Sequence, residues 1–142
     1  MRKIKGKKLI QHALIFGLFA TIFIPSSTFA WPSTGGFAFN IQPNQGNTRS
    51  EGAYRSANTT AIPWGVQVDS SNESGDKTYT RFWIEGVDGT NVSESANVLE
   101  DSGDKWVNPY STANQRTVYL TAENNNYNSE SFLVTGFWDE EK

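Results

Sequence analysis

The chain is 142 residues long, with no cysteine and a single histidine, His12. Five of its twelve basic residues lie within the first eight positions, so residues 31–142 carry seven Lys and Arg against 15 Asp and Glu, a net charge of −8. This charge argues against nucleic acids and anionic membranes as partners, because both select basic patches. The absence of cysteine and histidine after residue 30 excludes Ser-His-Asp and Cys-His catalysis there, and the usual zinc sites.

The first thirty residues have the organisation of a signal peptide. A basic start, Arg2 to Lys8, precedes an apolar stretch of 12 residues, Ala13 to Ile24, and Pro25 to Ala30 then supplies a helix break and small residues. We predict cleavage after Ala30 and a secreted protein that is extracellular or associated with the cell wall. An uncleaved membrane anchor is the alternative, but the apolar stretch is shorter than the ~20 residues that span a bilayer.

Residues 31–142 have the length of one domain, and residues 31–36, rich in Gly and Ser, are predicted to be its flexible start. A secreted domain without disulfides depends on its core alone, which is ordinary among Gram-positive bacteria. We therefore expect a Gram-positive source and a single β domain over residues 31–142.

Alternating apolar and polar residues predict five strands that each bury one face. The apolar positions are, in chain order, Phe37, Phe39 and Ile41; Trp64, Val66 and Val68; Thr80, Phe82 and Ile84; Val118, Leu120 and Ala122; and Phe132, Val134 and Gly136. Weaker strand candidates are residues 53–56, 95–99 and 106–110, and residues 49–60 are predicted to be mainly a loop. Gly, Asn and Asp gather between the strands, as turns require.

These features predict an all-β fold, a single small antiparallel β-sandwich or partly open barrel of about seven or eight strands. No stretch of 12 residues keeps helical periodicity, which disfavours an α/β fold. The core is predicted from the apolar phases of the strongest strands. It comprises Phe39, Trp64, Val66, Phe82, Ile84, Val118, Leu120, Phe132 and Val134.

The tetrapeptide Ser-Gly-Asp-Lys occurs at residues 74–77 and again at 102–105, each time before a strand that carries an aromatic residue. The preferred interpretation is a pair of hairpin connections in which Gly supplies a positive φ. The alternative is a duplicated site in which Asp76 and Asp104 hold a cation or a ligand hydroxyl.

An acidic loop offers the best metal candidate. Glu100, Asp101 and Asp104 lie close in sequence, and carboxylate oxygens suit calcium, yet the spacing of an EF-hand loop is absent. An unspecialised acidic surface is the preferred interpretation of these residues, and no metal site is expected. No cofactor is expected.

The dipeptide Phe-Trp occurs twice, at residues 82–83 and 137–138. Neighbouring residues of a strand point to opposite faces, so each pair is expected to place one ring in the core and one on the second face. If Phe82 faces the core, then Tyr79, Arg81 and Trp83 share the outward face, with Tyr119 as a neighbour. These four residues are the predicted ligand-binding patch, suited to stacking on sugar rings or to a protein interface. The alternative is that residues 49–60 fold over this face and form a second small core.

Catalysis is not expected. Paired carboxylates, as in glycoside hydrolysis, are the only catalytic groups that remain, and so small a domain offers little walled cleft.

Four segments resemble a family of small exported proteins from bacilli. They are Pro63-Trp64 with the alternation of Val66 and Val68, residues 80–85, residues 118–128 and the end of the chain, residues 135–141. The resemblance implies secretion and a Bacillales source. The function of that family is unknown, so the resemblance implies no catalytic or binding residue.

We therefore expect a secreted, monomeric, non-enzymatic binding protein of a Gram-positive bacterium, whose partner is an extracellular protein or cell-wall carbohydrate. The alternative is a secreted antagonist, bacteriocin-like or toxin-like, that acts on a protein receptor. A membrane-active route is disfavoured, because membrane-active helices are cationic and amphipathic.

Overall fold

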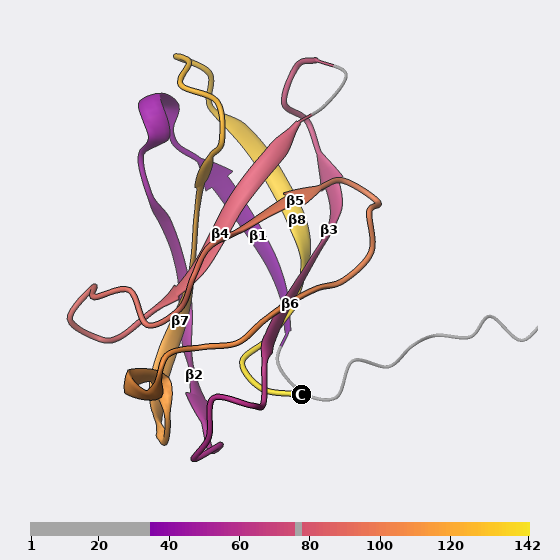
Figure 1. Cartoon of the computed structure of the whole chain (residues 1–142). Helices are drawn as coiled ribbons and strands as arrows, with labels where there is room; N and C mark the ends of the chain where they lie inside the picture. Colours follow the sequence, from indigo (N-terminus) through magenta and orange to yellow (C-terminus); the bar gives the residue numbers. More distant parts are fainter. Residues whose placement is uncertain (1–34, 76–77) are drawn as a thin grey trace, which may run out of the picture.

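The computed structural model describes residues 35–75 and 78–142, and these residues form an all-β fold (Figure 1). Its strands are β1 (Gly35–Ile41), β2 (Thr48–Arg55), β3 (Trp64–Ser71), β4 (Tyr79–Glu85), β5 (Ala96–Leu99), β6 (Lys105–Val107), β7 (Arg116–Asn124) and β8 (Phe132–Asp139). Two single 3-10 turns, η1 (Pro43–Gln45) and η2 (Ser111–Ala113), interrupt the loops. The predicted signal peptide lies outside the described residues. Within them, no helix has the length and hydropathy needed to cross a bilayer.

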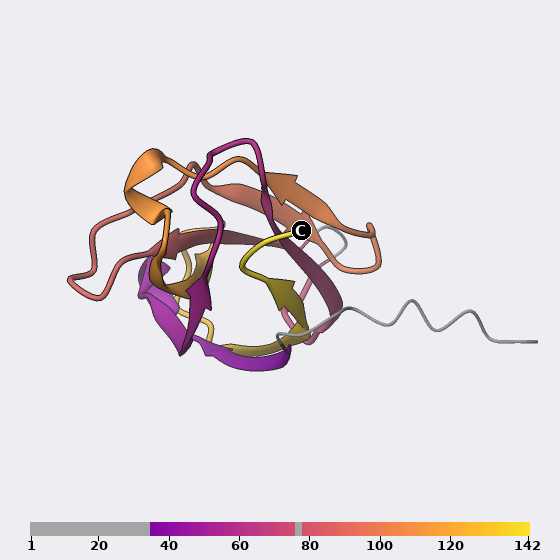
Figure 2. The same cartoon turned by 90° about the horizontal axis from the view of Figure 1, so that it is seen from below.

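The strands form two antiparallel sheets of four. Sheet I has the order β1-β8-β3-β6, and sheet II has the order β2-β7-β4-β5. Figure 2, turned to look from below, shows the sheets curving around a shared interior. The sheets do not close into a barrel, because β1 and β6 end one sheet and β2 and β5 end the other. The predicted sandwich is thus confirmed.

The core lies between the inner faces of the two sheets. All nine residues predicted for it are buried there, and Trp64, Phe82 and Leu120 are fully inaccessible to solvent. Phe37 on sheet I joins the two layers, with ring centroids 5.6 Å from Phe82 on sheet II and 4.9 Å from Phe39 on its own strand. Strand alternation therefore predicted correctly which residues face inward.

The prediction of a loop over residues 49–60 is wrong for residues 49–55, because β2 occupies residues 48–55 and pairs with β7, whereas residues 56–60 do lie in a loop. This strand is at the edge of sheet II, and the register shifts between Arg49 and Gly52 as in a β-bulge. Most side chains of this edge strand are exposed or half-buried, and only Arg55 is buried. The apolar alternation that identifies central strands is consequently absent from it.

The predicted flexible start, residues 31–36, overlaps the first strand at its last two residues. Gly35 and Gly36 belong to β1 and pair with Trp138 and Phe137 on β8. Glycine offers no side chain by which sequence could reveal a strand. Residues 31–34 lie outside the described part of the chain.

The two Ser-Gly-Asp-Lys segments are not hairpin connections. β3 and β4 belong to different sheets, and so do β5 and β6, so both segments lie in crossovers between layers. The expected positive φ is present at Gly75 (125°) and Gly103 (77°). Asp76 and Lys77 lie outside the described residues, so the proposed duplicated site concerns Asp104 alone here.

Candidate functional site

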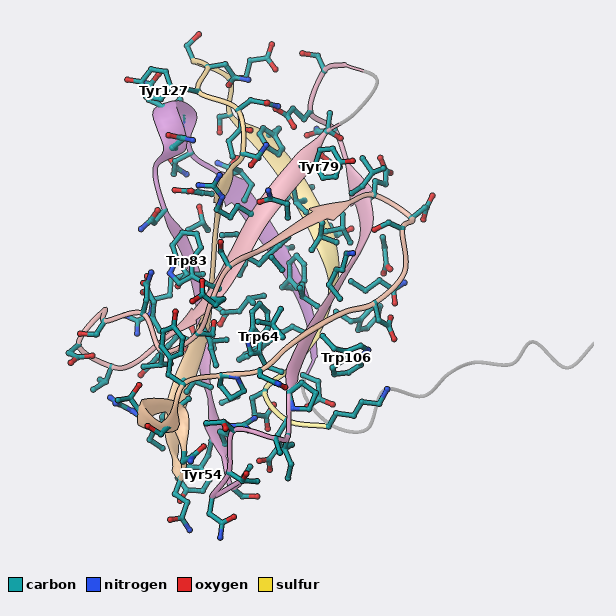
Figure 3. The ribbon with its side chains drawn as sticks, in the orientation of Figure 1. Tyr54, Trp64, Tyr79, Trp83, Trp106 and Tyr127 are labelled. Atoms are coloured by element: carbon teal, nitrogen blue, oxygen red, sulfur yellow. The ribbon has the colours of Figure 1, made fainter. Side chains whose placement is uncertain are left out.

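The predicted ligand-binding patch lies on the outer face of sheet II. Tyr79, Arg81 and Trp83 alternate along β4 with the buried Phe82, as predicted. Tyr119 on β7 is paired with Glu85, so it lies diagonally across from Trp83. The four residues therefore share one face, with Trp83 beside β7 in Figure 3.

Trp83 is not on a solvated face, contrary to the prediction. Its exposed fraction is 6%. The indole Nε1 donates a hydrogen bond to Oε1 of Glu85, two residues along the same strand, at 2.8 Å. Alternation predicts to which face the ring points, but not how exposed it is on that face. A buried ring offers no platform on which a sugar could stack.

Arg81 uses its donors within the fold. Its guanidinium donates to Glu123 at 2.8 Å, to Asn125 at 3.1 Å and to Asn97 at 3.3 Å. These partners lie on β7, just after it, and on β5. The side chain therefore ties three adjacent chain segments of sheet II together.

Arg49 of β2 covers Tyr119. Its guanidinium carbon lies 3.8 Å from the centroid of the Tyr119 ring, a cation–π contact, and its Nε lies 3.7 Å from Oε2 of Glu85. The same guanidinium donates to the carbonyl of Gly86. Residues 49–60 thus contribute to covering this face, as the alternative anticipated, although through a side chain of an edge strand and not through a folded loop.

The acidic loop between β5 and β6 does not assemble a metal site. Asp101 and Asp104 are exposed, and Glu100 is half-buried. In residues 35–75 and 78–142, no three His, Cys, Asp or Glu side chains are grouped so that they could hold a metal ion. The calcium alternative for Glu100, Asp101 and Asp104 therefore gains no support from the part of the chain that the structure describes.

A cluster of charges is buried at the C-terminus. Arg55 is fully buried and donates to the carbonyls of Thr59, Ile62 and Glu140. Burial lowers the pKa of its guanidinium, against the opposing charges of the C-terminal carboxylates. Burial likewise raises the pKa of Asp139.

Glu141 anchors this C-terminal segment. Burial alone would raise its pKa, but hydrogen bonds from Ser56 Oγ and the Ala57 amide, both 2.6 Å, outweigh that effect and lower it. Because the two terminal nitrogens of Arg55 and both carboxylate oxygens of Glu141 bond to the protein's own chain, this cluster acts as a structural clamp. The buried Nε of Arg55 has no hydrogen-bond partner among the described residues.

A cleft between the edge strands β1 and β2 is the best candidate for a binding site. Its volume is about 390 Å³, within the range typical of ligand-binding clefts. Five consecutive residues of each strand, 35–39 and 48–52, line it together with Trp138. Phe37, Phe39 and Trp138, which are mostly buried, contribute an apolar component.

The β2 side of this cleft is polar. Thr48 Oγ1 donates to the carbonyl of Asn40 at 2.8 Å. Ser50 Oγ, within the bulge, accepts from the Leu120 amide at 3.0 Å and donates to the Glu51 carbonyl at 2.6 Å. The Glu51 side chain is exposed and forms no hydrogen bond or ion pair with any residue that the structure describes. It is the charged group of the cleft available to a ligand.

Sequence reasoning missed this site. Among the lining residues, the sequence places Phe39 in the core, Phe37 on the apolar face of the same strand and Trp138 in a Phe-Trp pair, but it assigns residues 49–52 to a loop. One sequence feature could have indicated the site. The segment Gly35 to Ile41 has no charged residue and begins with two glycines, and the polar residues 48–52 follow soon after it. Its meaning depends on both segments being edge strands, which only the sheet order shows.

The fold and the cleft define an all-β sandwich domain with an open seam between two edge strands. The chain belongs to the family described as Protein of unknown function (DUF2712), whose model matches residues 27–142. No curated protein and no solved structure matches the chain.

Proposed function

We propose that this protein is a secreted, non-enzymatic binding protein of a Gram-positive bacterium, and that its ligand occupies the cleft between β1 and β2. The cleft of about 390 Å³ carries the proposal. It is concave, it combines an apolar part with a polar rim, and its Glu51 carboxylate has no partner within the described chain. The outer face of sheet II, the predicted patch, is less suitable because its polar groups already bind one another.

Binding is favoured over catalysis by the chemistry of the cleft lining. Acid–base hydrolysis of glycosides needs two carboxyl groups at a defined separation. Among the described residues that line the cleft, Glu51 is the only carboxylate, and no histidine or cysteine follows residue 30 in the sequence. Arg49, the cation of the lining, is engaged with Glu85 and Tyr119.

Secretion and a Gram-positive source are supported by sequence. The basic start and the apolar stretch before Ala30 have the order of a signal peptide. The resemblance to exported proteins of bacilli and the absence of cysteine agree with this assignment.

The test expresses the full chain in a Gram-positive host and measures retention of the processed protein on isolated cell walls and on immobilised extracellular proteins of that host. A Glu51→Trp variant fills the cleft from an exposed position without removing an internal contact. We expect it to lose at least tenfold in retention on whichever material binds the native protein.

The matched control is Asp104→Trp, which makes the same change of charge and a similar change of size at an exposed position far along the chain and outside the cleft lining. Its retention should equal that of the native protein. Equal retention of native protein and Glu51→Trp, or no retention on either material, would contradict the proposal.

A further inference from the structure

Of the four edge strands, β1 alone lacks the features that keep sheet edges from pairing with another chain. Short length, charged residues and bulges are such features. β5 and β6 have four and three residues, while β2 carries a bulge and the charged residues Arg49, Glu51 and Arg55. β1 has seven residues, Gly-Gly-Phe-Ala-Phe-Asn-Ile, with no charge and no proline, and its pairing with β8 is regular.

The free edge of β1 points into the cleft. In a strand, the N–H and C=O of one residue point to the same side, and this side alternates from residue to residue. The carbonyl of Asn40 accepts from Thr48 Oγ1 on β2, so it points away from β8 and toward β2. Gly36 and Ala38 share its phase, and their peptide groups therefore lie on the same open side.

No hydrogen bond joins the peptide groups of Gly36 or Ala38 to β2 or to any other part of the described chain on that side. Both residues line the cleft and both are exposed. Two donors and two acceptors at alternate positions are what an added β-strand requires.

We propose that the cleft binds an extended peptide segment of a partner protein, which adds to sheet I as a strand beside β1 and carries a basic residue that pairs with Glu51. This inference rests on the proposed function and names the class of its ligand. The cleft spans five residues of β1, so the added strand covers about five residues.

Charge favours a basic segment. Glu51 is the unpaired charge of the lining, and residues 31–142 together carry −8. Complementary charge steers association and selects partners, so acidic segments are disfavoured at this position. The same charge disfavours a second copy of this chain as the partner, because residues 31–142 of that copy would also carry a net charge of −8.

The cleft suits a peptide better than a glycan. Sugar rings bind to the exposed faces of aromatic side chains. Phe37, Phe39 and Trp138 expose only 8%, 4% and 5% of their surfaces, so they present narrow apolar contacts and no open ring face. Backbone groups and one carboxylate remain as the recognition elements.

The test selects linear heptapeptides from a random phage-displayed library on the host-processed native protein. We expect enriched peptides to contain alternating apolar residues and a Lys or Arg. On binding of a synthesised enriched peptide, amide exchange should slow at Gly36 and Ala38, while the amides of β5 and β6 should be unaffected.

Two substitutions at Ala38 supply the decisive comparison. Ala38→Pro removes the outward N–H, and proline is tolerated on the open side of an edge strand. Ala38→Val keeps the N–H at the same exposed position. We expect Ala38→Pro to weaken binding of the peptide at least tenfold and Ala38→Val to bind it as the native protein does. In a separate selection, Glu51→Lys should enrich acidic peptides in place of basic ones.

Peptides that bind Ala38→Pro as tightly as the native protein, or that slow no amide of β1, would overturn the strand-addition model. If no peptide is enriched while retention on cell walls still depends on Glu51, the ligand is not a linear peptide and only this inference fails. A dimer in sedimentation that Ala38→Pro dissolves would assign the edge to a second copy and overturn it likewise.

Discussion

Two adjacent residues on β4, Phe82 and Trp83, are both buried, but on opposite faces of the sheet. Phe82 is fully buried in the core between the sheets, whereas Trp83 is buried on the outer face with its N–H bonded to Glu85. Both rings are removed from water, but only Phe82 contacts the opposite sheet, through Phe37.

Truncation of the core should be costly. We expect Phe82→Ala or Leu120→Ala to lower the free energy of unfolding by about 2–5 kcal/mol, because each leaves a cavity between the sheets. This is a large part of the ~5–15 kcal/mol that a domain typically possesses. Urea unfolding measures it, with Leu133→Ala as the control, since Leu133 is 46% exposed. Unchanged midpoints for both core variants would refute the assignment of the inner face.

The C-terminal clamp predicts a pH-dependent stability. The pKa of Glu141 lies below its ordinary value of 4.5 in the folded protein. Its contribution is therefore present above about pH 4.5 and is lost as the pH falls through the lower, folded value. Glu141→Gln weakens the bonds from Ser56 and Ala57, so it should cost roughly 1.5 kcal/mol at pH 7.

The measurement compares urea unfolding of Glu141→Gln and native protein at pH 7 and pH 3. The difference between them should shrink as the pH falls, because the native carboxylate loses its charge as the pH passes through its lowered, folded pKa. Glu51→Gln, at an exposed residue with no side-chain partner in the described chain, should match the native protein at both values. A difference of the same size at both pH values would show that charge on Glu141 is irrelevant.

At the scale of elements, sheet I depends on a close approach of β8 to β3. A Cβ atom on Gly136 would lie 2.0 Å from the carbonyl oxygen of Gln67 and 2.9 Å from the Phe37 ring. The Gln67 carbonyl belongs to the backbone of β3, so it cannot move aside as the end of a flexible side chain could. Gly136 is therefore required by packing at this point of β8, beside the register shift between Val68 and Ser70.

Gly136→Ala should destabilise the domain by about 1–3 kcal/mol, as overpacking of a core does. Gly36→Ala is the matched control in the same sheet, since its nearest contact would be an ordinary 3.6 Å. Thermal unfolding compares the two variants. Equal stability of Gly136→Ala and Gly36→Ala would mean that β3 and β8 can separate locally without cost.

At the scale of the whole molecule, the first prediction concerns processing. The full chain, expressed in a Gram-positive host, should appear in the medium or the cell-wall fraction with Trp31 as its first residue, because the small residues before this point suit signal peptidase. N-terminal sequencing and mass determination check this. Retention of residues 1–30 in a membrane fraction would instead support an anchor.

The antagonist hypothesis stays a separate prediction at this scale, and it is tested by spotting the processed protein on lawns of related bacteria. A binding protein leaves no zone of inhibition. A zone that Glu51→Trp abolishes would assign the cleft to a receptor on the target cell.

The sequence alone determined the fold class and the inner faces of the strong strands. Phe39, Trp64 and Leu120 were correctly assigned to the core, since burial on one face of a strand imposes a period of two on the sequence. Gly75 and Gly103 were correctly expected to adopt positive φ, a local property of glycine.

Only the tertiary structure decided which strands are edges and what covers the outer face. Trp83 is buried although it points to the outer face, and Tyr119 is covered by Arg49, a residue distant in the sequence. A local sequence pattern does not report such contacts. The cleft likewise arises because β1 and β2, consecutive in sequence, end different sheets. Periodicity reports which way a side chain points from its own strand, whereas exposure depends on neighbours that the order of strands brings together.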